Sequence, residues 1–161
     1  MMTEQEGAKW VIRGYDDATD RTGVMDLWRV AFGYEAAHND PALAIARKVA
    51  VNDGLFFVAT LGASLVGTVM AGYDGHRGWL YSVAVHPQQR GLRLGSQLVR
   101  AAEQALTQRG CVKINLQLLA SNQATAAFYQ SLGYAIEPRV NMGKVLSVNV
   151  PAPAAAITAQ N

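Results

Sequence analysis

The segment Val83–Ser96, VAVHPQQRGLRLGS, constrains the fold of this chain more than any other part of the sequence. An apolar run typical of a strand leads through a proline turn and an Arg-Gly pair into a helix. We predict that this helix runs from about Leu92 to Arg109, because Gly110 is a typical helix end. Backbone N–H groups at a helix start have no intrahelical partner and carry partial positive charge. The turn is therefore a candidate anion site, although many such turns bind nothing.

The elements before this segment alternate between strand and helix patterns. Asn39-Asp40-Pro41 is typical of a helix start, with a capping side chain and proline in the first turn. Asn52-Asp53-Gly54 is typical of a helix end. The predicted order is strand Trp10–Tyr15, helix Thr22–Phe32, a helix from Pro41 to about Asn52, and strands Leu55–Leu61, Ser64–Tyr73 and Trp79–Val85.

The elements after the segment complete an α/β (α+β) fold. We predict a strand Val112–Leu118, a helix capped by Ser121 or Asn122 that ends at Leu132, and strands Tyr134–Arg139 and Met142–Val150. A helix joins Trp79–Val85 to Val112–Leu118, and a right-handed crossover makes those two strands parallel. The expected fold is one domain over residues 1–150, with a mixed, mostly antiparallel sheet of about six to seven strands and about four helices on both faces. Residues 151–161 are expected to be a low-complexity, flexible tail.

Composition excludes several classes of protein. Half of the residues are apolar and 16% are charged, which excludes a disordered chain, a coiled coil and a collagen-like fibre. No apolar run is long enough to span a membrane, and the acidic N-terminus is unlike a signal peptide, so we expect a cytoplasmic protein. The single cysteine, Cys111, excludes an intramolecular disulfide, and we expect it to be a small buried side chain. The three histidines lack metal-ligand spacing, so no metal is expected.

Charge is distributed unevenly along the chain. Residues 1–75 hold six basic and ten acidic side chains, whereas residues 76–161 hold eight basic and two acidic ones. The basic second half suits a compact polyanionic ligand, and the acidic first half mildly favours a cationic acceptor. The net charge of +2 is too small to indicate a nucleic-acid binder.

Two motifs together resemble the GNAT family, the GCN5-related N-acetyltransferases. The first is Arg90–Gly95, RGLRLG, after the strand end Val83–Pro87; the second is Asn122, the aromatic pair Phe128-Tyr129, and Leu132-Gly133-Tyr134. The resemblance covers about residues 9–149. Further stretches around Asn39–Pro41 and Gly72–Gly78 are similar to a bacterial branch, the YpeA-like acetyltransferases.

The resemblance implies a site for acetyl-CoA. The pantetheine arm would lie between two splayed parallel strands and pair with the backbone of Val83 and Val85, near Asn122. The pyrophosphate would lie on the N–H groups at the start of the helix, and the N–H near Val83 would stabilise the oxyanion. Tyr129 matches the tyrosine that protonates the departing thiolate. The implied cofactor-binding residues are Val83, Ala84, Val85, Arg90, Gly91, Leu92, Arg93, Leu94, Gly95, Ser96, Asn122 and Tyr129.

The resemblance further implies a primary amine as acceptor, and it leaves the identity of that amine open. Some relatives use a glutamate base at the position of Tyr81, which cannot act as a base when neutral. We expect Tyr81 instead to form a wall of the substrate pocket or to pack in the core. Other candidates for a base or an acceptor contact are Glu35, His38, Asp74 and His76, and a water relay serves equally well.

One residue departs from the family pattern, because Arg93 stands where the family has a glycine. We expect cofactor binding to survive, since a helix start does not need a positive φ there. This departure and the missing glutamate keep a second interpretation open, a non-catalytic acyl-CoA-binding regulatory module. A nucleic-acid binder is a third interpretation, and we expect no membrane partner. Pairing of two copies into a homodimer is an open alternative, since related proteins often pair through sheet edges.

Overall fold

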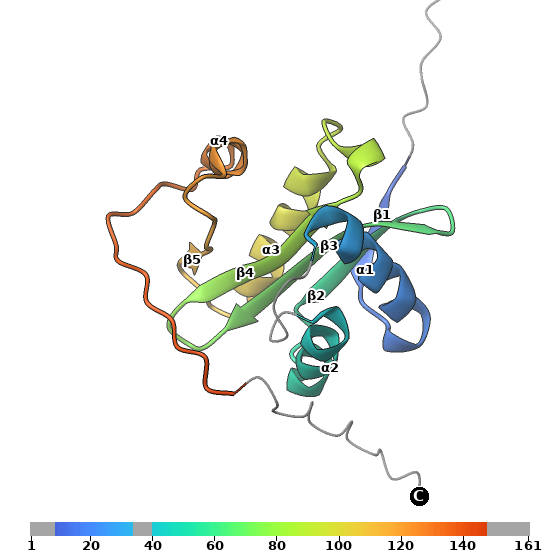
Figure 1. Ribbon diagram of the computed structural model, residues 1–161, viewed down its shortest axis with the longest axis horizontal. Helices are drawn as coiled ribbons and strands as arrows, with labels where there is room; N and C mark the ends of the chain where they lie inside the picture. The colour runs from blue at the N-terminus through green and yellow to red at the C-terminus, as the bar shows by residue number, and fades with distance from the viewer. Residues whose placement is uncertain (1–8, 34–39, 148–161) are drawn as a thin grey trace, which may run out of the picture.

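The structure is a computed structural model that describes residues 9–33 and 40–147. Figure 1 shows these residues arranged around one sheet, whose strand order is β1-β2-β3-β4-β5. The first four strands are antiparallel neighbours, and β5 is parallel to β4. The strands are β1 (Val11–Gly14), β2 (Phe56–Leu61), β3 (Ser64–Tyr73), β4 (Gly78–Val85) and β5 (Ile114–Asn115). This mixed, mostly antiparallel sheet with a parallel pair confirms the predicted fold class.

Four α-helices and a short 3-10 helix accompany the sheet. They are α1 (Asp17–Ala31), α2 (Pro41–Val51), η2 (Pro87–Gln89), α3 (Leu94–Gln108) and α4 (Gln123–Ser131). Helix α2 begins and ends as predicted, because the Asp40 side chain accepts a hydrogen bond from Leu43 N and Asn52 takes a left-handed conformation with a φ of 51°. Helix α1 begins earlier than predicted, because the Asp16 side chain caps it through Ala18 N.

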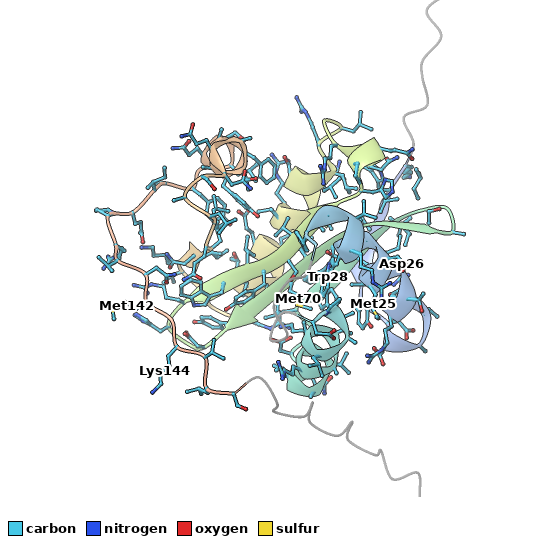
Figure 2. The ribbon with its side chains drawn as sticks, viewed as in Figure 1. Met25, Asp26, Trp28, Met70, Met142 and Lys144 are labelled. Carbon is cyan, nitrogen blue, oxygen red and sulfur yellow. The ribbon has the colours of Figure 1, made fainter. Side chains whose placement is uncertain are left out.

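The helices cover both faces of the sheet, as predicted, and each face has its own apolar core. On one face, Val24, Trp28 and Ile45 of α1 and α2 pack against β2 and β3. Figure 2 shows Trp28 close to Met70 in this core. On the other face, α3 packs Leu98 and Leu106 against Val69, Ala71 and Leu80. Strand β4 therefore lies between two buried layers, and both layers fix its position.

The described part of the chain has fewer strands than predicted. Strand β5 is limited to Ile114–Asn115, and the chain over residues 134–147 is in no strand. Val140 and Met142 are each 89% exposed, and Figure 2 shows Met142 and Lys144 at the periphery of the molecule. An alternating apolar pattern predicts a strand only where a neighbouring strand offers backbone partners. This segment contacts the rest of the chain through side chains instead, since Tyr134 packs on the core and Gln117 Nε2 donates to Asn141 Oδ1 at 2.6 Å. Residues 148–161, including the predicted tail, lie outside the described residues.

A search of the described helices for a membrane span finds none that is long and apolar enough.

Candidate functional site

A cleft of about 1080 Å³ lies where β4 and β5 separate. The ladder between these strands joins only Gly78 with Ile114 and Trp79 with Asn115. Beyond those pairs, residues 80–85 of β4 and residues 116–119 after β5 line the cleft, and α4 contributes Phe128 and Tyr129. The splayed parallel pair leaves backbone and side chains of β4 accessible to a ligand.

A bulge in β4 shapes the wall of this cleft. Thr68 pairs with Ala84 and Met70 pairs with Tyr81, so Ser82 and Val83 together face a single residue of β3. Ser82 has a φ of 47°, which is left-handed backbone. The hydroxyl of Thr68, fully buried, donates to the Ser82 carbonyl oxygen at 2.8 Å and accepts from Trp28 Nε1 at 2.8 Å. Sequence reasoning missed this bulge, whose one signal is a polar residue within an apolar strand.

The turn into α3 has two left-handed residues, Gly91 with a φ of 77° and Arg93 with a φ of 68°. The expectation that the Arg93 position does not need a positive φ is therefore wrong, because Arg93 takes a left-handed conformation directly before α3. No side chain caps α3, so its first N–H groups remain available to other acceptors. Arg90 extends this polar surface, and its Nε donates to the Val85 carbonyl oxygen at 3.2 Å.

The cleft collects nearly all the residues that the family resemblance singled out for cofactor binding. Leu92 is the exception, since it does not line the cleft and its side chain is 53% exposed. Those that line it are Val83, Ala84, Val85, Arg90, Gly91, Arg93, Leu94, Gly95, Ser96, Asn122 and Tyr129.

Gly95 permits a close approach between α3 and α4. A Cβ atom at this position would lie 3.2 Å from Cζ of Phe128 and 3.7 Å from Cγ2 of Val85. Such a distance to Phe128 is shorter than ordinary van der Waals contact, so a Cβ at Gly95 would force the Phe128 ring to shift by a few tenths of an ångström. The absence of a side chain at Gly95 therefore lets the start of α3 pack closely against Phe128 in the wall of the cleft.

Tyr129 is buried at the edge of the cleft, with only 6% of its surface exposed. Its ring makes edge contacts with Phe128 and Tyr134. Burial raises the pKa of Tyr129 to about 12, because the phenolate would lose solvation. Within the described residues, no hydrogen bond ties up its hydroxyl, whereas the Tyr134 hydroxyl donates to Glu103 Oε1 at 2.8 Å. Tyr129 is thus a protonated donor facing a cleft.

Asn122 begins α4 and lines the cleft at the same time. Its Oδ1 accepts a hydrogen bond from Thr125 N at 3.2 Å. This bond fixes the side chain and leaves its amide N–H groups for another partner.

The described residues that were predicted to act as a base or to contact the acceptor do not all line the cleft. Tyr81 lines the cleft and is 51% exposed. His76 is exposed in the turn between β3 and β4 and does not line the cleft. The Asp74 carboxylate accepts the backbone N–H groups of His76 and Arg77 at 2.7 Å, and these bonds lower its pKa. Glu35 and His38 lie outside the described residues.

Sequence reasoning missed several apolar residues of the cleft. They resemble ordinary core side chains in the sequence, and their place in the wall of the cleft is seen only in the structure. These residues are Phe32, Trp79, Leu118 and Leu119.

A search of the described residues for three or more His, Cys, Asp or Glu side chains arranged to hold a metal finds no such group. Cys111 is buried beside Gly78, and its Sγ donates to the Lys113 carbonyl oxygen at 3.3 Å. This placement confirms that Cys111 is a packing residue.

Comparison with known proteins identifies the family to which this site belongs. The sequence model of the Acetyltransferase (GNAT) family matches residues 21–134, which include both motifs and every described wall of the cleft. The chain belongs to the GNAT family. A GNAT relative from Yersinia pestis, named acetyltransferase, is 40% identical over 111 residues, which are 69% of this chain and 79% of that protein. These matches confirm the predicted family and its bacterial relatives, and they identify the chain as an N-acetyltransferase.

Solved structures share the GNAT fold. An acetyltransferase from Streptococcus agalactiae superposes with a TM-score of 0.70 at 18% identity, covering 86% of this chain and 92% of the other. AAC(6')-Iy, solved in complex with the bisubstrate analogue CoA-S-monomethyl-acetylneamine, superposes with a TM-score of 0.68 at 17% identity, covering 85% and 98%. At these identities the likeness establishes the fold, and the acceptor must be argued from the site.

Proposed function

We propose that this GNAT enzyme transfers the acetyl group of acetyl-CoA directly to a primary amine in a ternary complex. One observation carries the proposal: the start of α3, the bulged strand β4 and the protonated Tyr129 line one cleft. The bisubstrate analogue bound by AAC(6')-Iy joins CoA to an acetylated amine compound, which is consistent with a shared cleft in this fold.

The donor set at the start of α3 fits the phosphate groups of acetyl-CoA. The uncapped N–H groups of Leu94, Gly95 and Ser96 carry the positive end of the helix dipole. Arg90 and Arg93 add two guanidinium groups that line the same cleft. These residues would hold the pyrophosphate, while backbone groups of Val83 and Val85 would pair with the pantetheine arm as an added strand.

The bulge at Ser82 and Val83 is the proposed oxyanion site. A bulge interrupts the ladder with β3 and turns backbone groups away from their strand partner. A backbone N–H near Val83 would then donate to the carbonyl oxygen as it gains negative charge. Thr68 holds this conformation through its hydrogen bond to the Ser82 carbonyl oxygen.

The transfer step follows from these positions. The amine lone pair forms the N–C bond, and the C–S bond of the thioester breaks. Tyr129 donates its phenolic proton to the leaving thiolate, and the excess proton on the nitrogen passes to water and returns to the phenolate. The products are the N-acetylamine and CoA thiol, so atoms and charge balance. Because the pKa of Tyr129 is about 12, its proton is present at neutral pH.

Thiol release from acetyl-CoA with a broad panel of primary amines tests the proposal. We expect turnover above the hydrolysis rate with at least one amine, and an initial-velocity pattern of intersecting lines that marks a ternary complex. Acetyl-CoA binding without turnover of any amine would contradict it and would favour a non-catalytic acyl-CoA-binding module.

A further inference from the structure

The turn that precedes α3 is bonded to a side chain next to β1, the edge strand of the sheet. Trp10, directly before β1, donates from its indole Nε1 to Oε1 of Gln89 at 3.0 Å, across 79 positions of sequence. We propose that Gln89 donates its side-chain amide to the pyrophosphate of acetyl-CoA, and that Trp10 is the positioning residue that orients this amide. This inference rests on the proposed function and adds two residues to the same cofactor site.

The other hydrogen bonds of this turn are local. Gln89 N, for example, donates to the His86 carbonyl oxygen at 2.8 Å, within the start of η2. Among the residues that the structure describes, the bond from Trp10 is the one hydrogen bond between residues 87–93 and a segment distant in the sequence. It therefore restrains the turn relative to the sheet.

Packing holds Trp10 itself in place. Its ring is one of the partly buried side chains that pack against the core under α3. Ile12, two residues further along, packs against the same core, as the alternation of side chains in a strand requires. A partly buried indole N–H needs an acceptor, and the Gln89 side chain supplies it.

The indole determines how the Gln89 amide is oriented. An indole N–H only donates, so it pairs with the amide oxygen and leaves the two N–H groups of Nε2 to point elsewhere. Gln89 is half-buried and lines the cleft beside Arg90. Within the described part of the chain, no hydrogen bond occupies Nε2 of Gln89. The amide nitrogen is therefore a pre-oriented donor in the wall of the cleft.

The groups around this donor make phosphate its fitting acceptor. Arg90, Arg93 and the uncapped start of α3 supply positive charge from the same turn. A hydrogen bond to an anionic phosphate oxygen is stronger than one between neutral groups. Because Trp10 orients the amide before the ligand arrives, binding costs less side-chain freedom. Gln89 thus adds affinity for the pyrophosphate without adding charge.

Calorimetric titration of acetyl-CoA into variants of the two residues tests the inference. Gln89→Leu removes the amide, and we expect Kd to rise about tenfold, the scale of one hydrogen bond to a charged group. Gln104→Leu makes the same exchange at an exposed position of α3 outside the cleft and should leave Kd unchanged. A folded Gln89→Leu protein that binds like the wild type would overturn the inference and leave the proposed function intact. Absence of wild-type binding would overturn both.

Gln89→Glu separates a phosphate contact from a purely structural bond. The carboxylate still accepts from Trp10, but it meets the phosphate with negative charge instead of a donor. We therefore expect Kd to rise more than in Gln89→Leu. If Gln89 only held the turn, glutamate would bind acetyl-CoA better than leucine does, and that ranking would contradict the phosphate contact.

The positioning role of Trp10 has its own test. Trp10→Phe keeps an aromatic ring and removes the N–H, and we expect Kd to rise about threefold. In the Gln89→Leu background the same change should have no further effect, because Trp10 acts through Gln89. No rise in the single variant, or an equal rise in both backgrounds, would overturn this role.

A comparison of CoA with 3′-dephospho-CoA identifies the phosphate. Both ligands carry the pyrophosphate, so Gln89→Leu should weaken the binding of each by the same factor. A loss confined to CoA would place Gln89 at the 3′-phosphate and would overturn its assignment to the pyrophosphate.

Discussion

The buried hydroxyl of Thr68 donates a 2.8 Å hydrogen bond to the carbonyl oxygen of Ser82, the left-handed residue of the β4 bulge. The same hydroxyl accepts from Trp28 Nε1, so the bulge is connected to α1 through one oxygen atom. A buried residue of β3 thereby fixes the backbone of β4 that lines the cleft.

Replacement of Thr68 by valine keeps the shape of the side chain and removes both hydrogen bonds. We expect the free energy of unfolding to fall by about 1–3 kcal/mol, because a buried indole N–H and a carbonyl lose their partner. We also expect kcat to fall, since the bulge is no longer held. Denaturant unfolding and steady-state kinetics measure the two effects. Thr107→Val, on the exposed side of α3, is the control and should leave kcat unchanged.

Removal of the Tyr129 hydroxyl tests the proposed general acid. Tyr129→Phe preserves the edge contacts with Phe128 and Tyr134, so folding and acetyl-CoA affinity should change little. We expect kcat to fall by about 10²-fold or more, the usual contribution of a positioned acid. Tyr73→Phe, outside the cleft, controls for loss of a phenol. A kcat that is equal in Tyr129→Phe and the wild type would assign the proton to water.

The pH dependence of kcat follows from the pKa of Tyr129. An acid must be protonated to act, and a pKa raised to about 12 keeps the phenol protonated throughout the neutral and mildly alkaline range. The rate should therefore rise as the amine loses its proton and then stay level to about pH 10. A pH–rate profile with a decline centred near pH 8 or 9 that is absent in Tyr129→Phe would contradict this placement of the proton.

Arg93 has a backbone conformation that favours glycine, with a φ of 68°. Arg93→Gly should raise the free energy of unfolding by about 1 kcal/mol, because it removes the left-handed penalty. The same substitution at Arg100, an exposed position inside α3, should lower it by about 1 kcal/mol. Acetyl-CoA affinity should weaken several-fold in Arg93→Gly and depend less on salt, since a phosphate contact is lost. Unchanged affinity and salt dependence would show that Arg93 makes no phosphate contact.

Local sequence signals predicted the elements whose causes are local. Helix α2 begins at Asp40-Pro41 and ends at Asn52, as expected, because helix capping depends on residues that are neighbours in the sequence. The motif residues around α3 and α4 share one cleft because a strand and a helix of predictable length connect them. The bulge at Ser82 and the short β5 depend on packing between distant segments, and the sequence alone did not reveal them. The left-handed φ of Arg93 was missed because an arginine does not signal such a conformation. Nor did the sequence reveal that Phe32 and Trp79 line the cleft, since both have the pattern of core residues.

Calorimetric titration of acetyl-CoA tests the central claim, that the turn before α3 and the cleft beside it bind the cofactor. The wild type should bind with micromolar affinity. Gly95→Trp should lose binding, because a Cβ there already lies 3.2 Å from Phe128 and the indole would enter the cleft. Gly143→Trp, at an exposed glycine with no neighbour within 4 Å, should bind like the wild type. Absence of wild-type binding, or equal binding by a folded Gly95→Trp, would contradict the account.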